Sequence, residues 1–220
     1  LVNDKKYKDA QAMLEKAVAL VPDNAEMRYE LAAVHLENGA LDLSLNEIKE
    51  AITLEPKVAR YLLMSGKILI AKKTLDAAVE PLQKAMSLEP KNAEIPFELC
   101  NLYSKKGYYS IAINHCKKAL DLNISDYDMM NRLAWLYAKK GTSFDQGLEL
   151  AKKVVEARPE KAEYWDTIAE LYFAKGDIEK AVENIKKAAE LNPGESYYKQ
   201  QLWKFTKSKS SSKFPSNSSS

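Results

Sequence analysis

The residues that could carry covalent or metal chemistry are few, and their spacing gives them little opportunity. The chain has two cysteines, Cys100 and Cys116, and two histidines, of which His115 adjoins Cys116. Adjacent residues on a helix point in different directions, and a structural zinc site needs four ligands, so we predict no metal site. We interpret the two cysteines as buried small residues that pack between helices. A disulfide is the alternative, and it requires Cα atoms within about 7 Å of each other.

Catalytic motifs are also missing from the sequence. None of the seven glycines belongs to a phosphate-binding loop, and neither H-E-x-x-H nor G-x-S-x-G occurs. His35 takes a position among apolar residues and is interpreted as a packed ring. The carboxylates are spread along helix faces, and no two of them are placed as an acid and a base. We therefore predict that the chain is not an enzyme, has no catalytic residues and uses no cofactor.

Composition and charge exclude several other classes of function. Hydrophobic residues make up 46% and charged residues 29% of the 220 residues, which is typical of an ordered globular chain. The net charge of +2 gives no overall attraction to nucleic acid or to an anionic membrane. No apolar run is long enough to cross a bilayer. We expect no nucleic-acid partner and no direct membrane insertion.

The elements that position these residues follow from a repeat, which the prolines reveal. Pro22, Pro56 and Pro90 are 34 residues apart, as are Pro159 and Pro193. The interval from Pro90 to Pro159 fits two further periods, one of which is longer by a single residue. A fixed period of this length indicates an array of supersecondary units.

Small residues recur in the same phase. Three columns run along the chain: Ala10, Ser44, Ala78, Ala112, Gly147 and Ala181; Ala17, Ala51, Ala85, Ala119, Val154 and Ala188; and Ala32, Gly66, Cys100, Ala134 and Ala169. Small side chains let helices approach closely, so these columns predict the contact line of a helix pair. Glycines in the middle of the units, at Gly39, Gly107, Gly141 and Gly176, suit a left-handed residue that ends a first helix. Each unit is therefore predicted to be helix, tight turn, helix.

This pattern resembles the tetratricopeptide repeat. The best copy is 162–195, which has Trp165, Ile168, Ala169, Tyr172, Gly176, Ala181, Ile185, Ala188 and Pro193 at the family's positions. The resemblance implies an all-α fold, a right-handed superhelical solenoid of helix-turn-helix repeats.

The complete units are 25–58, 59–92, 93–126, 127–161 and 162–195. Residues 1–24 correspond to the last part of another unit, and together with the start at Leu1 this leads us to expect a piece of a longer protein. A capping helix is predicted over 194–206 and a disordered Ser/Lys-rich tail over 207–220, so the array is 1–206. Pro81 falls inside a second helix, and it predicts a kink or a local shift in 59–92.

The family places the first helix of each unit on the inner, concave wall, and this implies where a partner binds. We predict that the partner-binding residues are Tyr29, Glu30, Leu63, Met64, Lys67, Glu94, Phe97, Glu98, Asn101, Asn131, Arg132, Trp135, Asp166, Glu170 and Phe173. The full set of such positions holds eight acids (Glu26, Glu30, Glu94, Glu98, Asp128, Glu163, Asp166 and Glu170) and three bases (Arg60, Lys67 and Arg132), which gives 3 − 8 = −5. We therefore expect a negative, partly aromatic concave face.

The function that follows is an interaction scaffold, which takes a peptide or helix with basic and apolar residues into the groove. Two alternatives stay open. In the first, the chain is an accessory region of a larger enzyme or of a secretion or assembly machine. In the second, it is an RNA-binding helical repeat, and the acidic groove argues against this second alternative. A cytoplasmic location is favoured, and a periplasmic location or an anchor upstream of Leu1 is the alternative. The sequence names neither the partner nor the oligomeric state.

Overall fold

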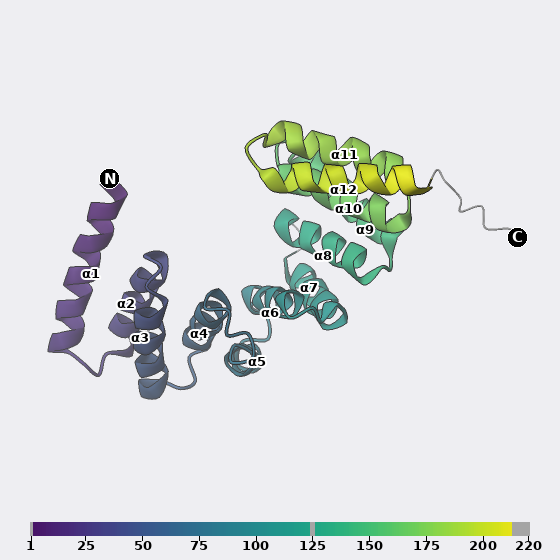
Figure 1. Cartoon of the computed structure of the whole chain (residues 1–220). Coiled ribbons are helices and arrows are strands. Elements are labelled where there is room, and N and C mark those ends of the chain that lie inside the picture. Colours follow the sequence, from purple (N-terminus) through teal and green to yellow (C-terminus); the bar gives the residue numbers. More distant parts are fainter. Residues whose placement is uncertain (1, 124–125, 213–220) are drawn as a thin grey trace, which may run out of the picture. The chain divides into compact units, whose positions relative to one another are not determined.

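The computed structural model describes residues 2–123 and 126–212, with side chains described over 9–123 and 126–208. Within these residues the chain is built from helices and contains no strand. The helices group into two compact units, 1–108 and 109–220, and the boundary falls between α6 and α7 (Figure 1). Each unit is described by itself.

The first unit holds six helices in its described part. These are α1 (Val2–Leu20), α2 (Ala25–Glu37), α3 (Leu41–Leu54), α4 (Ala59–Ala71), α5 (Val79–Leu88) and α6 (Glu94–Lys105). The second unit holds α7 (Tyr109–Leu122), α8 (Tyr127–Lys140), α9 (Phe144–Ala157), α10 (Ala162–Lys175), α11 (Ile178–Leu191) and α12 (Ser196–Ser212). The helix pairs α2 and α3, α4 and α5, α8 and α9, and α10 and α11 each lie within one period of the sequence repeat.

Local sequence explains where the helices begin and end. Asn24 and Asp126 precede first helices, and their side chains accept hydrogen bonds from the backbone N–H groups of Met27 and Met129 at 3.0 and 2.9 Å. Gly39, Gly107, Gly141 and Gly176 all have a positive φ, between 72° and 91°, just after a first helix. The left-handed turn predicted from the glycine positions is therefore present at each of them.

The sequence predicts a kink or a local shift at Pro81 in the repeat 59–92. The structure contains the shift, because the second helix of this repeat is shortened at its start. Residues 75–78 form a turn, and α5 begins only at Val79. Pro81 consequently lies in the first turn of α5, where a missing N–H breaks no intrahelical hydrogen bond. The backbone bond from Ala78 N to the Leu75 carbonyl, at 3.3 Å, spans three residues, as in a 3₁₀ turn.

The small-residue columns lie where helices touch. A Cβ atom added to Gly66 of α4 would come within 2.5 Å of the Leu82 side chain of α5. At Gly147 of α9 the same addition would come within 2.7 Å of Leu171 in α10. The core of each unit forms around these contacts, and Ile48 and Leu82 are among its fully buried side chains.

The C-terminal helix α12 covers the end of the second unit. Phe205 and Tyr198 are buried in one core cluster with Ala169, Ile185 and Ala188 of α10 and α11. The helix extends to Ser212, so the expectation of disorder is wrong for 207–212, and 213–220 lie outside the described residues.

Both cysteines are fully buried, Cys100 in α6 and Cys116 in α7. Neither is a free thiol in the structure, which corrects the interpretation as two reduced small residues. His35 is buried, as expected of a packed ring.

Candidate protein-binding surface

In the second unit, α8 and α10 border a cavity of about 340 Å³, which we call the α8–α10 pocket. The residues that line it are Asp128, Asn131, Arg132, Trp135, Glu163, Tyr164, Asp166 and Thr167. Residues three and four apart share one face of a helix, and this spacing brings Asp128, Asn131, Arg132 and Trp135 of α8 to the cavity. Seven of the eight lining residues stand at the positions that the sequence predicts for the concave wall, and Tyr164 is the addition.

Two oxygen atoms in this pocket are buried without a hydrogen-bond partner. They are Oδ1 of Asn131 and Oδ1 of Asp166. The other carboxylate oxygen of Asp166 accepts a hydrogen bond from the hydroxyl of Tyr197 in α12 at 3.4 Å. A buried acceptor without a donor costs free energy, on the order of 1–3 kcal/mol. Two acceptors of residues that line the pocket are therefore unsatisfied.

The surroundings of Asp166 favour its neutral form. Its side chain is 8% exposed. Burial first, and then the neighbouring charge of Glu170, raise the pKa of Asp166 to about 7. Lys139, Lys204 and the Tyr197 hydroxyl act in the opposite direction and lower it. Asp166 thus changes charge near neutral pH.

Two tyrosines near Asp166 or Asp128 also have raised pKa values. The hydroxyl of Tyr164 donates a hydrogen bond to Asp128, and burial together with this bond raises the pKa of Tyr164 above its ordinary value. Burial and the charge of Asp166 raise the pKa of Tyr197 to about 12. Both phenols therefore stay protonated and act as donors over the range in which Asp166 titrates.

The α12 helix already contacts two of the predicted binding residues in α10. Glu170 accepts a hydrogen bond from Gln201 at 3.0 Å and forms ion pairs with Lys204 at 3.8 Å and with Lys139 at 3.3 Å. The rings of Phe173 and Phe205 stack with their centroids 4.4 Å apart. Glu170 and Phe173 therefore have partners within the unit and are not open binding positions.

Trp135 lies at the other side of the pocket, on α8, and is half-buried. Its ring meets that of Tyr109 edge to face, with 6.3 Å between centroids. The ammonium of Lys139 lies 5.2 Å from the ring centroid of Trp135. These contacts fix the indole while part of it stays accessible from the cavity.

In the first unit, two of the predicted apolar anchors belong to the core. Leu63 and Met64 are 6% and 9% exposed and pack in clusters with Leu99 and Ile68 respectively. Little of either side chain is therefore accessible to a partner. On the first helices of the adjacent repeats, α2 and α6, Tyr29, Phe97 and Asn101 are half-buried and Glu30 is exposed.

Charges at the predicted positions of the first unit are mostly paired with each other. Arg60 forms an ion pair with Glu26 and lies over the rings of Tyr29 and Tyr61. Lys67 and Glu94 form an ion pair at 2.9 Å. Glu26 and Glu94 are therefore paired with bases of the same wall.

Another predicted acid of this unit is buried. Glu98 is 9% exposed and accepts a hydrogen bond from the side-chain amide of Asn101 at 3.3 Å. Both residues were predicted to contact a partner, and in the structure they contact each other.

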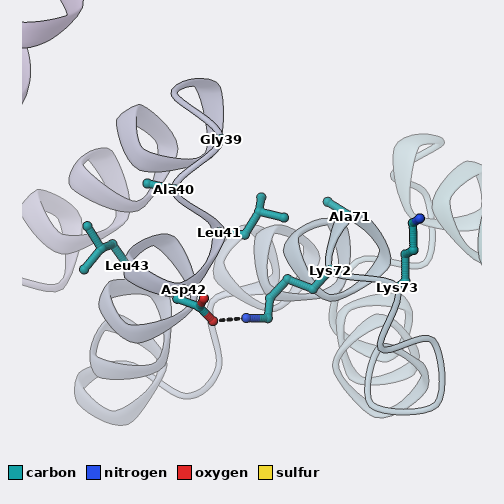
Figure 2. Close-up of a pocket in the computed structure, with 8 residues that line it drawn as sticks. All are labelled: Gly39, Ala40, Leu41, Asp42, Leu43, Ala71, Lys72 and Lys73. Atoms are coloured by element: carbon teal, nitrogen blue, oxygen red, sulfur yellow. Dashed lines mark hydrogen bonds and ion pairs between the residues drawn. The ribbon is translucent and has the colours of Figure 1, made fainter.

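Sequence reasoning missed a set of ion pairs between successive repeats. Lysines at the ends of first helices reach aspartates 30 residues earlier, near the start of a second helix. The pairs are Lys72 with Asp42, Lys106 with Asp76, and Lys175 with Asp145. The recurrence of an aspartate and a lysine at this fixed separation is the signal that could have predicted them. Figure 2 shows the first pair beside a cavity, which is bordered by 39–43, where a turn leads into α3, and by 71–73.

The described residues contain no group of three or more His, Cys, Asp or Glu side chains that could hold a metal ion. No helix in the described part of the chain is both long and apolar enough to span a membrane.

The fold and the surface together define an all-α helical-repeat solenoid. Models of the tetratricopeptide repeat match residues 1–68, 59–92 and 162–195, which together make up more than half of the chain. The chain belongs to the tetratricopeptide-repeat family. The comparison with curated proteins gives no match.

Solved structures with the same fold include repeat proteins that differ widely from this chain in sequence. YrrB, described as a TPR protein with an unusual peptide-binding site, is 21% identical, with a TM-score of 0.70 over 85% of this chain and 96% of its own. PilF of Pseudomonas aeruginosa is 19% identical, with a TM-score of 0.77 over 94% and 92% of the two chains. MamA of Desulfovibrio magneticus RS-1 is 20% identical, with a TM-score of 0.70 over 78% and 96%. At these identities the likeness concerns the fold, and together with the family it supports a protein-interaction scaffold.

Proposed function

We propose that this chain holds a segment of a partner protein against its first helices, and that the α8–α10 pocket is the principal contact. The segment is a peptide or helix that carries basic and apolar residues. Catalysis has no part in this proposal, because the pocket offers contacts and no pair of groups arranged as nucleophile and base.

The observation that carries the proposal is the pocket itself. It lies between two successive first helices, and it combines a half-buried tryptophan with acceptor atoms that lack donors. Buried aromatic anchors are enriched among the residues that dominate binding energy. Of the charged side chains that line it, Asp128, Glu163 and Asp166 are acidic and Arg132 is basic, so a basic segment is complementary to it.

The fold comparison supports the same class of ligand. YrrB is described as having a peptide-binding site, and its fold spans most of this chain. An accessory role in a larger assembly is compatible with the proposal, since a scaffold can serve as one part of such an assembly. RNA binding is disfavoured because three of the four charged groups in the pocket are acids, which repel phosphate.

Selection of peptide ligands tests the proposal. The whole chain is immobilised, a random peptide library is displayed against it, and the best peptide is measured by isothermal titration calorimetry. We expect the change Trp135→Ala to weaken this peptide at least about fivefold, because a truncated anchor at an interface costs more than about 1 kcal/mol. Trp203→Ala is the matched control, since Trp203 lies on α12 with 64% of its side chain exposed, outside the pocket.

The control should leave the affinity within about twofold, as expected for a residue outside the interface. Unchanged affinity for a folded Trp135→Ala variant would remove the pocket from the binding surface. Tight binding of single-stranded RNA at low salt, in the absence of any selectable peptide, would replace the proposal with the RNA-binding alternative.

A further inference from the structure

The α8–α10 pocket contains a carboxylate whose hydrogen-bonding capacity is only partly used. Asp166 is more than nine-tenths buried, and one of its oxygens has a donor in Tyr197 while Oδ1 has none. The amide oxygen of Asn131, on the facing helix α8, is also buried without a donor. Both residues line the same cavity, so two acceptors from two helices border one space.

We propose that the α8–α10 pocket is a binding site for one cationic side chain, an arginine or a lysine of the partner segment, which donates hydrogen bonds to Asp166 and Asn131. The inference rests on the proposed function, because the cation is taken to belong to a bound segment. It goes further in naming the group that enters the pocket and the two atoms that receive it.

The chemistry of the pocket selects a donor over an acceptor. Guanidinium and ammonium groups are donors only, and they carry the charge that a carboxylate favours. A ligand that brought an acceptor, such as a carboxylate or a phosphate, would leave both oxygens unpaired. The cavity of about 340 Å³ has room for one side chain and some water, since one water takes about 30 Å³ in the liquid.

The charges around Asp166 come from three helices. Glu170 is its neighbour on α10, Lys139 faces it from α8, and Tyr197 and Lys204 face it from α12. Three further charged residues line the same pocket, Asp128 and Arg132 of α8 and Glu163 of α10. Lys139 and Lys204 are engaged by Glu170 at 3.3 and 3.8 Å. Burial and Glu170 outweigh the two lysines and raise the pKa of Asp166 to about 7. The entering cation adds a positive charge next to Asp166, whose Oδ1 lacks a donor.

Binding of the cation is therefore linked to pH. A pKa of about 7 leaves Asp166 mostly protonated at pH 6 and mostly ionised at pH 8, and the cation pairs with the ionised form. The apparent affinity scales with the ionised fraction, so it should rise roughly tenfold between pH 6 and pH 8.

The stability of the protein without ligand should change with pH in the opposite direction. The raised pKa means that the folded state holds this proton more tightly than the unfolded state does. The free energy of unfolding therefore falls as pH rises through about 7, and Asp166→Asn, which mimics the neutral acid, should remove that fall.

The test uses a small probe on the whole chain. Nα-acetyl-arginine methylamide is titrated into ¹⁵N-labelled protein, and the indole N–H signal of Trp135 is followed by NMR at pH 6 and pH 8. Nα-acetyl-citrulline methylamide is the matched neutral probe, and Nα-acetyl-lysine methylamide tests the ammonium. We expect saturable shifts with the cationic probes that are roughly tenfold tighter at pH 8, and weaker, pH-independent shifts with citrulline.

Two variants complete the design. Asp166→Asn should weaken the arginine probe and abolish the pH dependence of both binding and thermal unfolding. Glu149→Gln, which removes an exposed acid of α9 that does not line the pocket, should change neither. If the arginine and citrulline probes bind alike, or if Trp135 shows no saturable shift, the inference is overturned.

Failure of this inference can be told apart from failure of the proposed function. A selected peptide that binds through Trp135 with no sensitivity to Asp166→Asn or to pH would overturn the cation site and leave the peptide-binding role in place. The absence of any selectable peptide would overturn the role itself.

Discussion

Lys73 adopts a backbone conformation that four glycines adopt at equivalent positions of other repeats. It follows α4 with φ of 61°, and it stands one repeat period after Gly39 and one before Gly107. A side chain with a Cβ atom is disfavoured there by roughly 1–2 kcal/mol. The 59–92 repeat therefore carries local strain at a position that glycine occupies in four other repeats.

Replacement of Lys73 by glycine should stabilise the chain. We expect Lys73→Gly to raise the free energy of unfolding by about 1 kcal/mol, since the strain is relieved but the flexible residue costs some entropy in the unfolded state. Urea denaturation of the whole chain, followed by circular dichroism, measures the change. Lys73→Ala keeps the Cβ atom and serves as the control. If the glycine variant is no more stable than the alanine variant, the backbone conformation at this position is not the source of strain.

Single residues of the candidate site show what the sequence could predict and what it could not. The repeat phase brought Asn131, Trp135 and Asp166 to one wall, and the structure places all three at one cavity. The same repeat phase predicted that Leu63 and Met64 are accessible to a partner on this wall, but both are buried. Periodicity identifies the face of a helix, whereas the exposure of a residue on that face depends on how closely the neighbouring helices pack.

At the scale of elements, the lysine–aspartate pairs join consecutive repeats wherever both members are present. Asp42 and Asp145 are second residues of their helices, as Ser110 is in α7. Lys140, the last residue of α8, follows Ser110 at the same separation that the three pairs share. The serine therefore replaces the acid at the position where a further pair is expected.

An aspartate at position 110 should supply this pair. We expect Ser110→Asp to stabilise the chain by about 0.5–1 kcal/mol, because an exposed ion pair and an acid in the first turn of a helix each contribute a fraction of a kcal/mol. Ser110→Asn is the uncharged control of the same shape. The gain of aspartate over asparagine, measured as a shift in the melting temperature, should shrink in about 1 M salt. Equal melting temperatures for the two variants at low salt would contradict the expected pair.

Helices also differ from the sequence prediction where one element covers another. The small-residue columns correctly indicated close contacts, such as that of Gly66 with Leu82. A capping helix was predicted, but its contacts with Glu170 and Phe173 were not, because the repeat phase assigns both side chains to the groove. A repeat pattern is weakest at its ends, where the next unit is missing.

At the scale of the whole molecule, the chain is an array of similar helix pairs that offers a surface for binding. The family matches and the solved structures agree on this fold. Binding in such an array depends on a few side chains that stay accessible between first helices. In the second unit, side chains of this kind line the α8–α10 pocket that we propose as the binding site, where Oδ1 of Asp166 and Oδ1 of Asn131 lack donors.

Site-specific photo-cross-linking tests most directly whether this pocket receives the partner. A photoreactive p-benzoylphenylalanine replaces Glu163, an exposed residue that lines the pocket, and in a second variant it replaces Glu149, an exposed residue of α9 that does not line it. Each variant is irradiated with the selected peptide, and the products are identified by mass spectrometry. Cross-links from position 163, and none from position 149, are the predicted result. Equal or stronger cross-linking from position 149 would contradict the account.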